Sequence, residues 1–77
     1  MEELFKNNPS YVVSEEVLKQ KKHFSVKEIL DSVKDRILIY FKNSIEALRQ
    51  FIIEQLDIMC EFGLIGKTSL YYFSINT

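Results

Sequence analysis

A long amphipathic run that ends at a glycine and leads into strand-like residues constrains the fold of this chain most. The run extends from Ser44 to Phe62 and is followed by Gly63. Apolar side chains at helical spacing predict a helix here, and Gly63 suits the left-handed residue that ends many helices. Two apolar segments, residues 64–65 and residues 70–75, then flank a short polar link. This arrangement predicts an antiparallel hairpin.

Two further helices are predicted before this run by their capping signals. Ser14 is followed by Glu15 and Glu16, an N-cap with carboxylates in the first turn, where the helix dipole favours negative charge. Ser25 and Glu28 have the spacing of a capping box, which is a more specific sign of a helix start. The apolar stripe expected on the second helix is Val26, Ile29, Leu30, Val33 and Ile37. The stripe expected on the third helix is Ile45, Leu48, Ile52, Leu56 and Met59.

Two segments receive no helix assignment. Residues 1–13, which include a turn signal around Pro9, are predicted to be a polar lead-in to a folded domain over residues 14–77. The apolar run from Ile37 to Phe41 fits either a short third strand or a hydrophobic connection between helices. Periodicity cannot separate these alternatives, because the run is too short.

Length and charge limit the functions that this chain can have. Its 77 residues form one small domain, and an apolar content of 47% favours a homodimer that buries part of the surface. Ten basic and eleven acidic residues give a net charge of −1, whereas DNA-binding domains are more often basic. Cys60 is the single cysteine, so the chain has no internal disulfide framework. No apolar run approaches a membrane span or a signal-peptide core, so a cytoplasmic protein without a membrane partner is expected.

The segment FSVKEIL at residues 24–30, followed by a long helix and by the sequence GLI at residues 63–65, resembles the winged helix-turn-helix superfamily. It is similar to the ferric-uptake-regulator-, MarR- and ArsR-type DNA-binding domains, over residues 14–75. The resemblance rests on caps and apolar spacings, and the connection at residues 35–43 is longer than in a tight helix-turn-helix. It implies an α+β fold, a three-helix winged helix-turn-helix with a C-terminal β-hairpin wing. It also implies a small sequence-specific DNA-binding protein, a transcriptional regulator of double-stranded DNA.

In that arrangement the N-terminal end of the third helix would enter the major groove, and the hairpin would touch the DNA backbone. Arg, Asn and Gln side chains can read bases, while lysines contact phosphates. The candidate DNA-binding residues are therefore Lys42, Asn43, Ser44, Arg49, Gln50, Lys67 and Thr68.

A second class of function stays open, in which a winged-helix domain binds a protein. The face of the third helix opposite its apolar stripe is acidic, which disfavours a polyanion and suits a basic partner. This face comprises Glu46, Gln50, Glu54, Asp57 and Glu61. Phe51 and Ile58 lie beside the stripe, where they would dock an apolar partner or pack within the domain.

The remaining features give no support to catalysis. His23 has no neighbouring acid, and Cys60 lies among apolar residues, as a core thiol does. The sequence Gly66-Lys67-Thr68 lacks the earlier glycine of a phosphate-binding loop, because Glu61 stands there. No pair of residues has metal-ligand spacing, so no enzyme, metal or cofactor is expected.

The basic run from Lys19 to His23 has two interpretations. Its cations would contact phosphates, or they would stabilise the negative end of the first helix. The second interpretation is favoured, because the helix end explains the charges locally.

Overall fold

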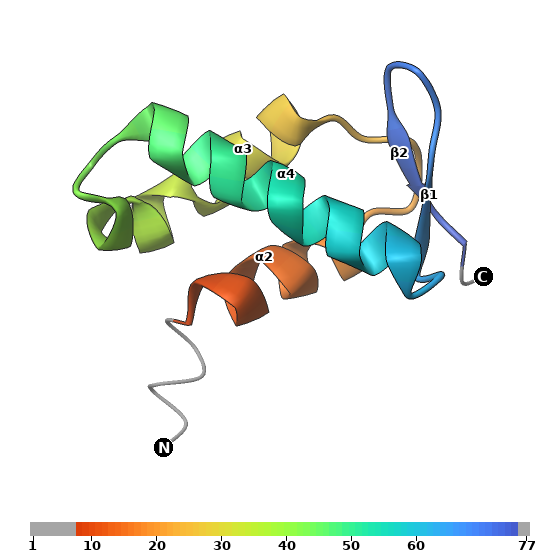
Figure 1. Ribbon diagram of the computed structural model, residues 1–77, viewed down its shortest axis with the longest axis horizontal. Helices are drawn as coiled ribbons and strands as arrows, with labels where there is room; N and C mark the ends of the chain where they lie inside the picture. The colour runs from red at the N-terminus through yellow and green to blue at the C-terminus, as the bar shows by residue number, and fades with distance from the viewer. Residues whose placement is uncertain (1–7, 76–77) are drawn as a thin grey trace.

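The computed structural model describes residues 8–75 (Figure 1). The elements are α2 (Pro9–Leu18), α3 (Val26–Ile37), the 3-10 helix η1 (Leu38–Phe41), α4 (Ile45–Glu61), β1 (Ile65–Lys67) and β2 (Tyr72–Ser74). Within these residues, three α-helices precede a two-stranded antiparallel hairpin, which confirms the predicted α+β class. The layout is compatible with a winged helix. No helix in residues 8–75 is both long enough and apolar enough to cross a bilayer.

The starts of α3 and α4 and the end of α4 follow their predicted local signals. The Oγ of Ser25 accepts a hydrogen bond from the Glu28 amide at 3.3 Å, and the Ser25 amide donates to Glu28 Oε1 at 2.9 Å. This is the predicted capping box, which satisfies two amides that the helix itself cannot pair. The Oγ of Ser44 accepts from the Ala47 amide at the start of α4. Gly63, with φ of 76°, is the predicted left-handed residue after that helix.

The predicted start of α2 at Ser14 is wrong. The helix begins at Pro9, and Asn8 caps it by accepting a hydrogen bond from the Tyr11 amide at 3.1 Å. Asparagine is a strong N-cap and proline fits the first helical position, so the expected turn signal is in fact a helix start. Residues 9–13 of the expected lead-in are therefore helical, and residues 1–7 of it lie outside the described residues.

The apolar run after α3 is not a strand. Residues 38–41 form η1, where Ile39 and Tyr40 are 71% and 54% exposed. The chain then reverses through Lys42 and Asn43, which both have positive φ, so the run finds its hydrogen bonds locally rather than in a sheet. Phe41 is the anchor of this turn, because its ring centroid lies 5.1 Å from that of Phe51 on α4. Phe51 therefore packs within the domain, against this turn.

The core lies where the three helices and the hairpin meet. The predicted stripes of α3 and α4 are confirmed, except that Val26 is half-buried and Ile45 is 44% exposed. Ile45 is the first residue of α4. The buried side chains are Val12, Val13, Val17, Phe24, Ile29, Leu30, Val33, Ile37, Leu48, Ile52, Leu56, Met59, Ile65 and Tyr72.

The hairpin is joined to the connection between α2 and α3. Its strands pair with Gly66 opposite Phe73 and Lys67 opposite Tyr72. Tyr72 also forms an antiparallel bridge with Phe24, through two backbone hydrogen bonds of 2.8 and 2.9 Å. The rings of these two residues stack at 5.9 Å between centroids. The bridge therefore holds the hairpin against the rest of the domain.

Replacing Ile52 by alanine is expected to lower the free energy of unfolding by about 2–5 kcal/mol, because it opens a cavity among side chains that are fully buried. Ile39→Ala removes the same atoms from an exposed side chain and should change this free energy by no more than about 0.5 kcal/mol. Urea titrations followed by circular dichroism measure both. Equal losses in the two variants would contradict the assignment of Ile52 to the core.

Candidate functional site

The turn before α4 presents two of the predicted DNA-binding residues. Lys42 and Asn43 have φ angles of 55° and 60°, and both side chains are exposed. Consecutive left-handed residues without glycine are uncommon, and such strained positions often belong to functional segments. Ser44 is the N-cap, so its Oγ already accepts the Ala47 amide and has a structural role. The structure therefore brings Lys42 and Asn43 together at the positive end of the α4 dipole.

Arg49 and Gln50 follow on the first turns of α4. Both side chains are exposed, and neither makes an ion pair or a side-chain hydrogen bond with any of residues 8–75. Glu46 stands beside them in the first turn, where it interacts favourably with the helix dipole. Residues 42–50 therefore include two exposed cations, Lys42 and Arg49, and one carboxylate, Glu46.

The two predicted contacts on the hairpin are less available than the sequence implied. The Nζ of Lys67 lies 5.8 Å from the centre of the Tyr72 ring, in a cation–π contact. The Thr68 hydroxyl donates to the Tyr71 carbonyl and accepts from the Leu70 and Tyr71 amides. One donor and two acceptor positions are all that a hydroxyl has, so this group is fully used in shaping the turn.

The predicted residues form two separate groups. Lys42 to Gln50 lie at the start of α4, and Lys67 and Thr68 follow its end, as the ribbon shows (Figure 1). The 17 residues of α4 rise about 25 Å along its axis, at 1.5 Å per residue. The two groups therefore lie at opposite ends of α4, too far apart along this helix to form one compact site.

An acidic surface separates the two groups. The side chains predicted to form it are all exposed. Their helical spacing places them on one face of α4, along its whole length. They are Glu46, Gln50, Glu54, Asp57 and Glu61. A partner that runs along this face of α4 would therefore meet carboxylates.

The two lysines of α3 are partly neutralised by a shared carboxylate. Lys27 and Lys34 lie 3.1 and 3.7 Å from the two oxygens of Asp31. The hydrogen bond from Lys27 lowers the pKa of Asp31, and the charge of Lys34 acts in the same direction. All three side chains are at the surface, so these pairs orient charge more than they stabilise the fold.

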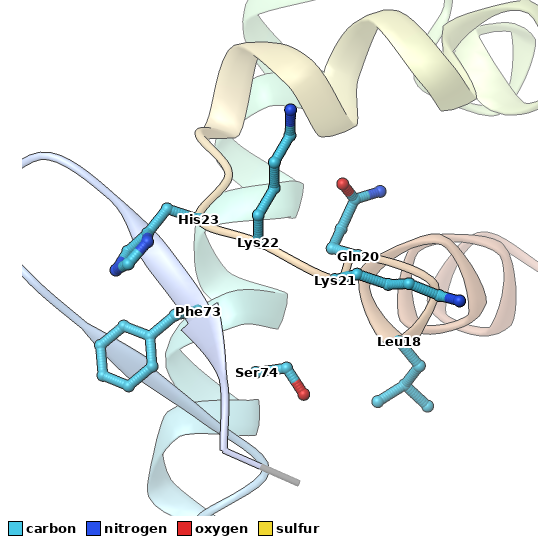
Figure 2. A pocket seen from close by; sticks show the side chains of 7 residues that line it. All are labelled: Leu18, Gln20, Lys21, Lys22, His23, Phe73 and Ser74. Carbon is cyan, nitrogen blue, oxygen red and sulfur yellow. The ribbon is translucent and has the colours of Figure 1, made fainter. Parts of the chain in front are cut away.

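A basic groove lies at the end of the domain away from the start of α4, and the sequence indicated only part of its lining. It has a volume of about 750 Å³ and lies between the end of α2 and β2 (Figure 2). Residues 20–23 of the predicted basic run form one part of its lining, beside Leu18, and the hairpin contributes the other part through Phe73 and Ser74. The sequence signal was the run from Lys19 to His23. The sequence did not indicate the bridge between Phe24 and Tyr72, which brings β2 beside this run.

Cys60 and His23, the two residues weighed for catalysis, have other surroundings. Cys60 packs beside the core, and burial raises the pKa of its thiol, with the negative charge of Asp57 acting in the same direction. His23 contacts the rings of Tyr71 and Phe73 on the hairpin. Among residues 8–75, no three His, Cys, Asp or Glu side chains are grouped to hold a metal ion.

Comparisons with protein-family models, with curated proteins and with solved structures find no match to this chain.

The Cys60 thiol is expected to react more slowly with Ellman's reagent at pH 8 in the folded protein than in urea. The raised pKa leaves less thiolate at this pH, and the thiolate is the reacting species. Asp57→Asn removes a charge that raises this pKa and should increase the rate in the folded protein. Stopped-flow absorbance measures the rates. Equal rates in buffer and urea would contradict a partly buried thiol.

Proposed function

We propose that this chain is a small winged-helix DNA-binding protein, a sequence-specific transcriptional regulator that inserts the N-terminal end of α4 into the major groove. Two features of the fold support it. Three helices precede a hairpin, and the bridge from Phe24 to Tyr72 adds a third extended segment beside β2. The observation that carries the proposal is the end of α4, where Lys42, Asn43 and Arg49 are exposed.

The physical chemistry of this helix end suits a phosphate backbone and base edges. The free amides of a helix N-terminus and its dipole attract anions, and Lys42 adds a full positive charge. Arg49 has the paired donors that recognise guanine, and Asn43 and Gln50 have those that recognise adenine. Glu54 lies about 14 Å along the axis from Ile45, so an insertion by the helix end keeps the later carboxylates outside the groove.

The double variant Lys42→Gln, Arg49→Gln is expected to weaken binding of random-sequence duplex DNA by tenfold or more. On random-sequence DNA both side chains would contact phosphates, so their loss should also reduce the slope of log affinity against log salt by about 1.8. Fluorescence anisotropy with a labelled duplex at several salt concentrations measures both quantities.

The matched control is Lys21→Gln, Lys22→Gln, which removes the same charge at the other end of the domain. It should bind the duplex within about threefold of the wild type, since distant exposed charges are screened. Equal weakening of both double variants would contradict binding by the end of α4.

Two single variants on α4 test the direction of insertion. Glu46→Gln removes a carboxylate from the first turn and should strengthen duplex binding, because it removes repulsion from nearby phosphates. Glu61→Gln removes the same charge from the last residue of α4 and should leave duplex affinity unchanged. Anisotropy at low salt measures both. Equal strengthening would instead mean that DNA lies along the whole helix.

A second function, binding of a basic protein partner, is favoured by the acidic surface of α4. Glu54, Asp57 and Glu61 are exposed there, and none of them is in an ion pair with another of residues 8–75. Absence of duplex binding by the wild type at low salt would support this function over the first. The homodimer also stays a prediction, and Ile58, Phe62 and Leu64 offer exposed apolar surface for a second copy to cover.

A further inference from the structure

We propose that the groove between α2 and β2 is a binding site for single-stranded nucleic acid. This function is separate from duplex binding by α4, and its site lies at the other end of the domain. Its residues come from the last residue of α2, from the loop between α2 and α3, and from β2. Lys21 and Lys22 would contact phosphates, and the rings of His23 and Phe73 would support a base.

Charge is the first reason for this assignment. Among residues 8–75, the lining of the groove is Leu18, Gln20, Lys21, Lys22, His23, Phe73 and Ser74, so this part of the lining includes two lysines and no carboxylate. Lys21 and Lys22 are exposed, and neither is in an ion pair with any of residues 8–75. The nearby Glu16 carboxylate accepts a hydrogen bond from the Gln20 side chain, which keeps it engaged on α2. A groove of one charge sign concentrates ligands of the other, here a polyanion.

Aromatic side chains are the second reason, and they distinguish nucleic acid from other polyanions. The ring of His23 lies 5.5 Å from that of Phe73 and 6.3 Å from that of Tyr71. Figure 2 shows His23 and Phe73 together on the hairpin side of the groove, while Lys21 and Lys22 extend to other sides of the loop. Sites that bind single-stranded nucleic acid usually combine cations with aromatic side chains, because the bases of a single strand are free to stack on them. The bases of a duplex are already stacked on one another.

The aromatic side of the groove is held in place before any ligand arrives. Phe73 is opposite Gly66 in the hairpin, and its ring covers the position that a Cβ of Gly66 would take, 2.3 Å from the nearest ring atom. The two hydrogen bonds between Phe24 and Tyr72 fix the loop beside β2. A preformed site loses less conformational entropy on binding. The volume of about 750 Å³ is in the range of small-ligand sites, roughly 300–1,000 Å³, so it accommodates a short part of a strand.

Anisotropy with a labelled oligothymidylate tests the proposal on the whole chain. Lys21→Gln, Lys22→Gln should weaken its binding by about tenfold and reduce the salt slope by about 1.4, which is the loss of two single-strand phosphate contacts. Lys42→Gln, Arg49→Gln should bind the same strand like the wild type. This pattern is the reverse of that expected for the duplex, so failure of one function is distinguished from failure of the other.

Two variants without a charge change test the aromatic part. Gly66→Ala displaces the Phe73 ring, and Phe73→Leu removes the ring while keeping an apolar side chain. Both should weaken binding of the strand about fivefold or more at an unchanged salt slope, because stacking releases no counterions. Thermal unfolding by circular dichroism checks that each variant is folded. If Gly66→Ala does not fold, Phe73→Leu alone decides the result.

Three results would overturn the proposal. One is absence of salt-dependent binding of the strand by the wild type. Another is equal weakening of strand binding by the two double variants, Lys21→Gln, Lys22→Gln and Lys42→Gln, Arg49→Gln. The third is displacement of the strand by polyglutamate as readily as by unlabelled oligothymidylate, together with full binding by Phe73→Leu. That third result would leave a general anion site in place of a nucleic-acid site.

Discussion

The two hydrogen bonds between Phe24 and Tyr72 are the constraint on which the arrangement of this domain depends. They join the loop before α3 to the strand after α4, and both side chains are buried against each other. A two-stranded hairpin is marginal by itself in water, and the bridge gives this one a third backbone segment and a share of the core. The place of the hairpin, and with it the shape of the basic groove, follows from this contact.

Charge is distributed so that cations flank α4 while carboxylates lie along its outer face. Exposed cations lie before α4 and in the loop beside the hairpin, while the carboxylates of α4 occupy its outer face between them. The net charge of −1 hides this separation. At physiological salt, charges more than about 8 Å apart across solvent are strongly screened, so the two surfaces are electrostatically independent. A weakly acidic protein can therefore present two basic surfaces.

Local signals were readable from the sequence, and contacts between distant residues were not. Ser25, Ser44 and Gly63 mark the helix ends because their hydrogen bonds or backbone angles involve only neighbouring residues. The start of α2 was misread because Asn8 and Pro9 favour turns and helix starts alike. The groove needed the bridge between Phe24 and Tyr72, and no feature of either segment alone identifies its partner. Where a site is shared between such segments, its sequence signal is only the part that one segment holds.

The two glycines of this chain illustrate why residue type alone does not reveal a site. Gly63 has a φ of 76° with open space where a Cβ would stand, so its role is conformational and ends α4. Gly66 is not among the residues with positive φ, and its missing side chain makes room for the ring of Phe73. The centre of that ring lies 5.5 Å from the centre of the His23 ring, on the same side of the groove. The absence of a side chain at Gly66 thus determines the position of the Phe73 ring in the groove, while the charges of the groove come from Lys21 and Lys22 in another part of the chain.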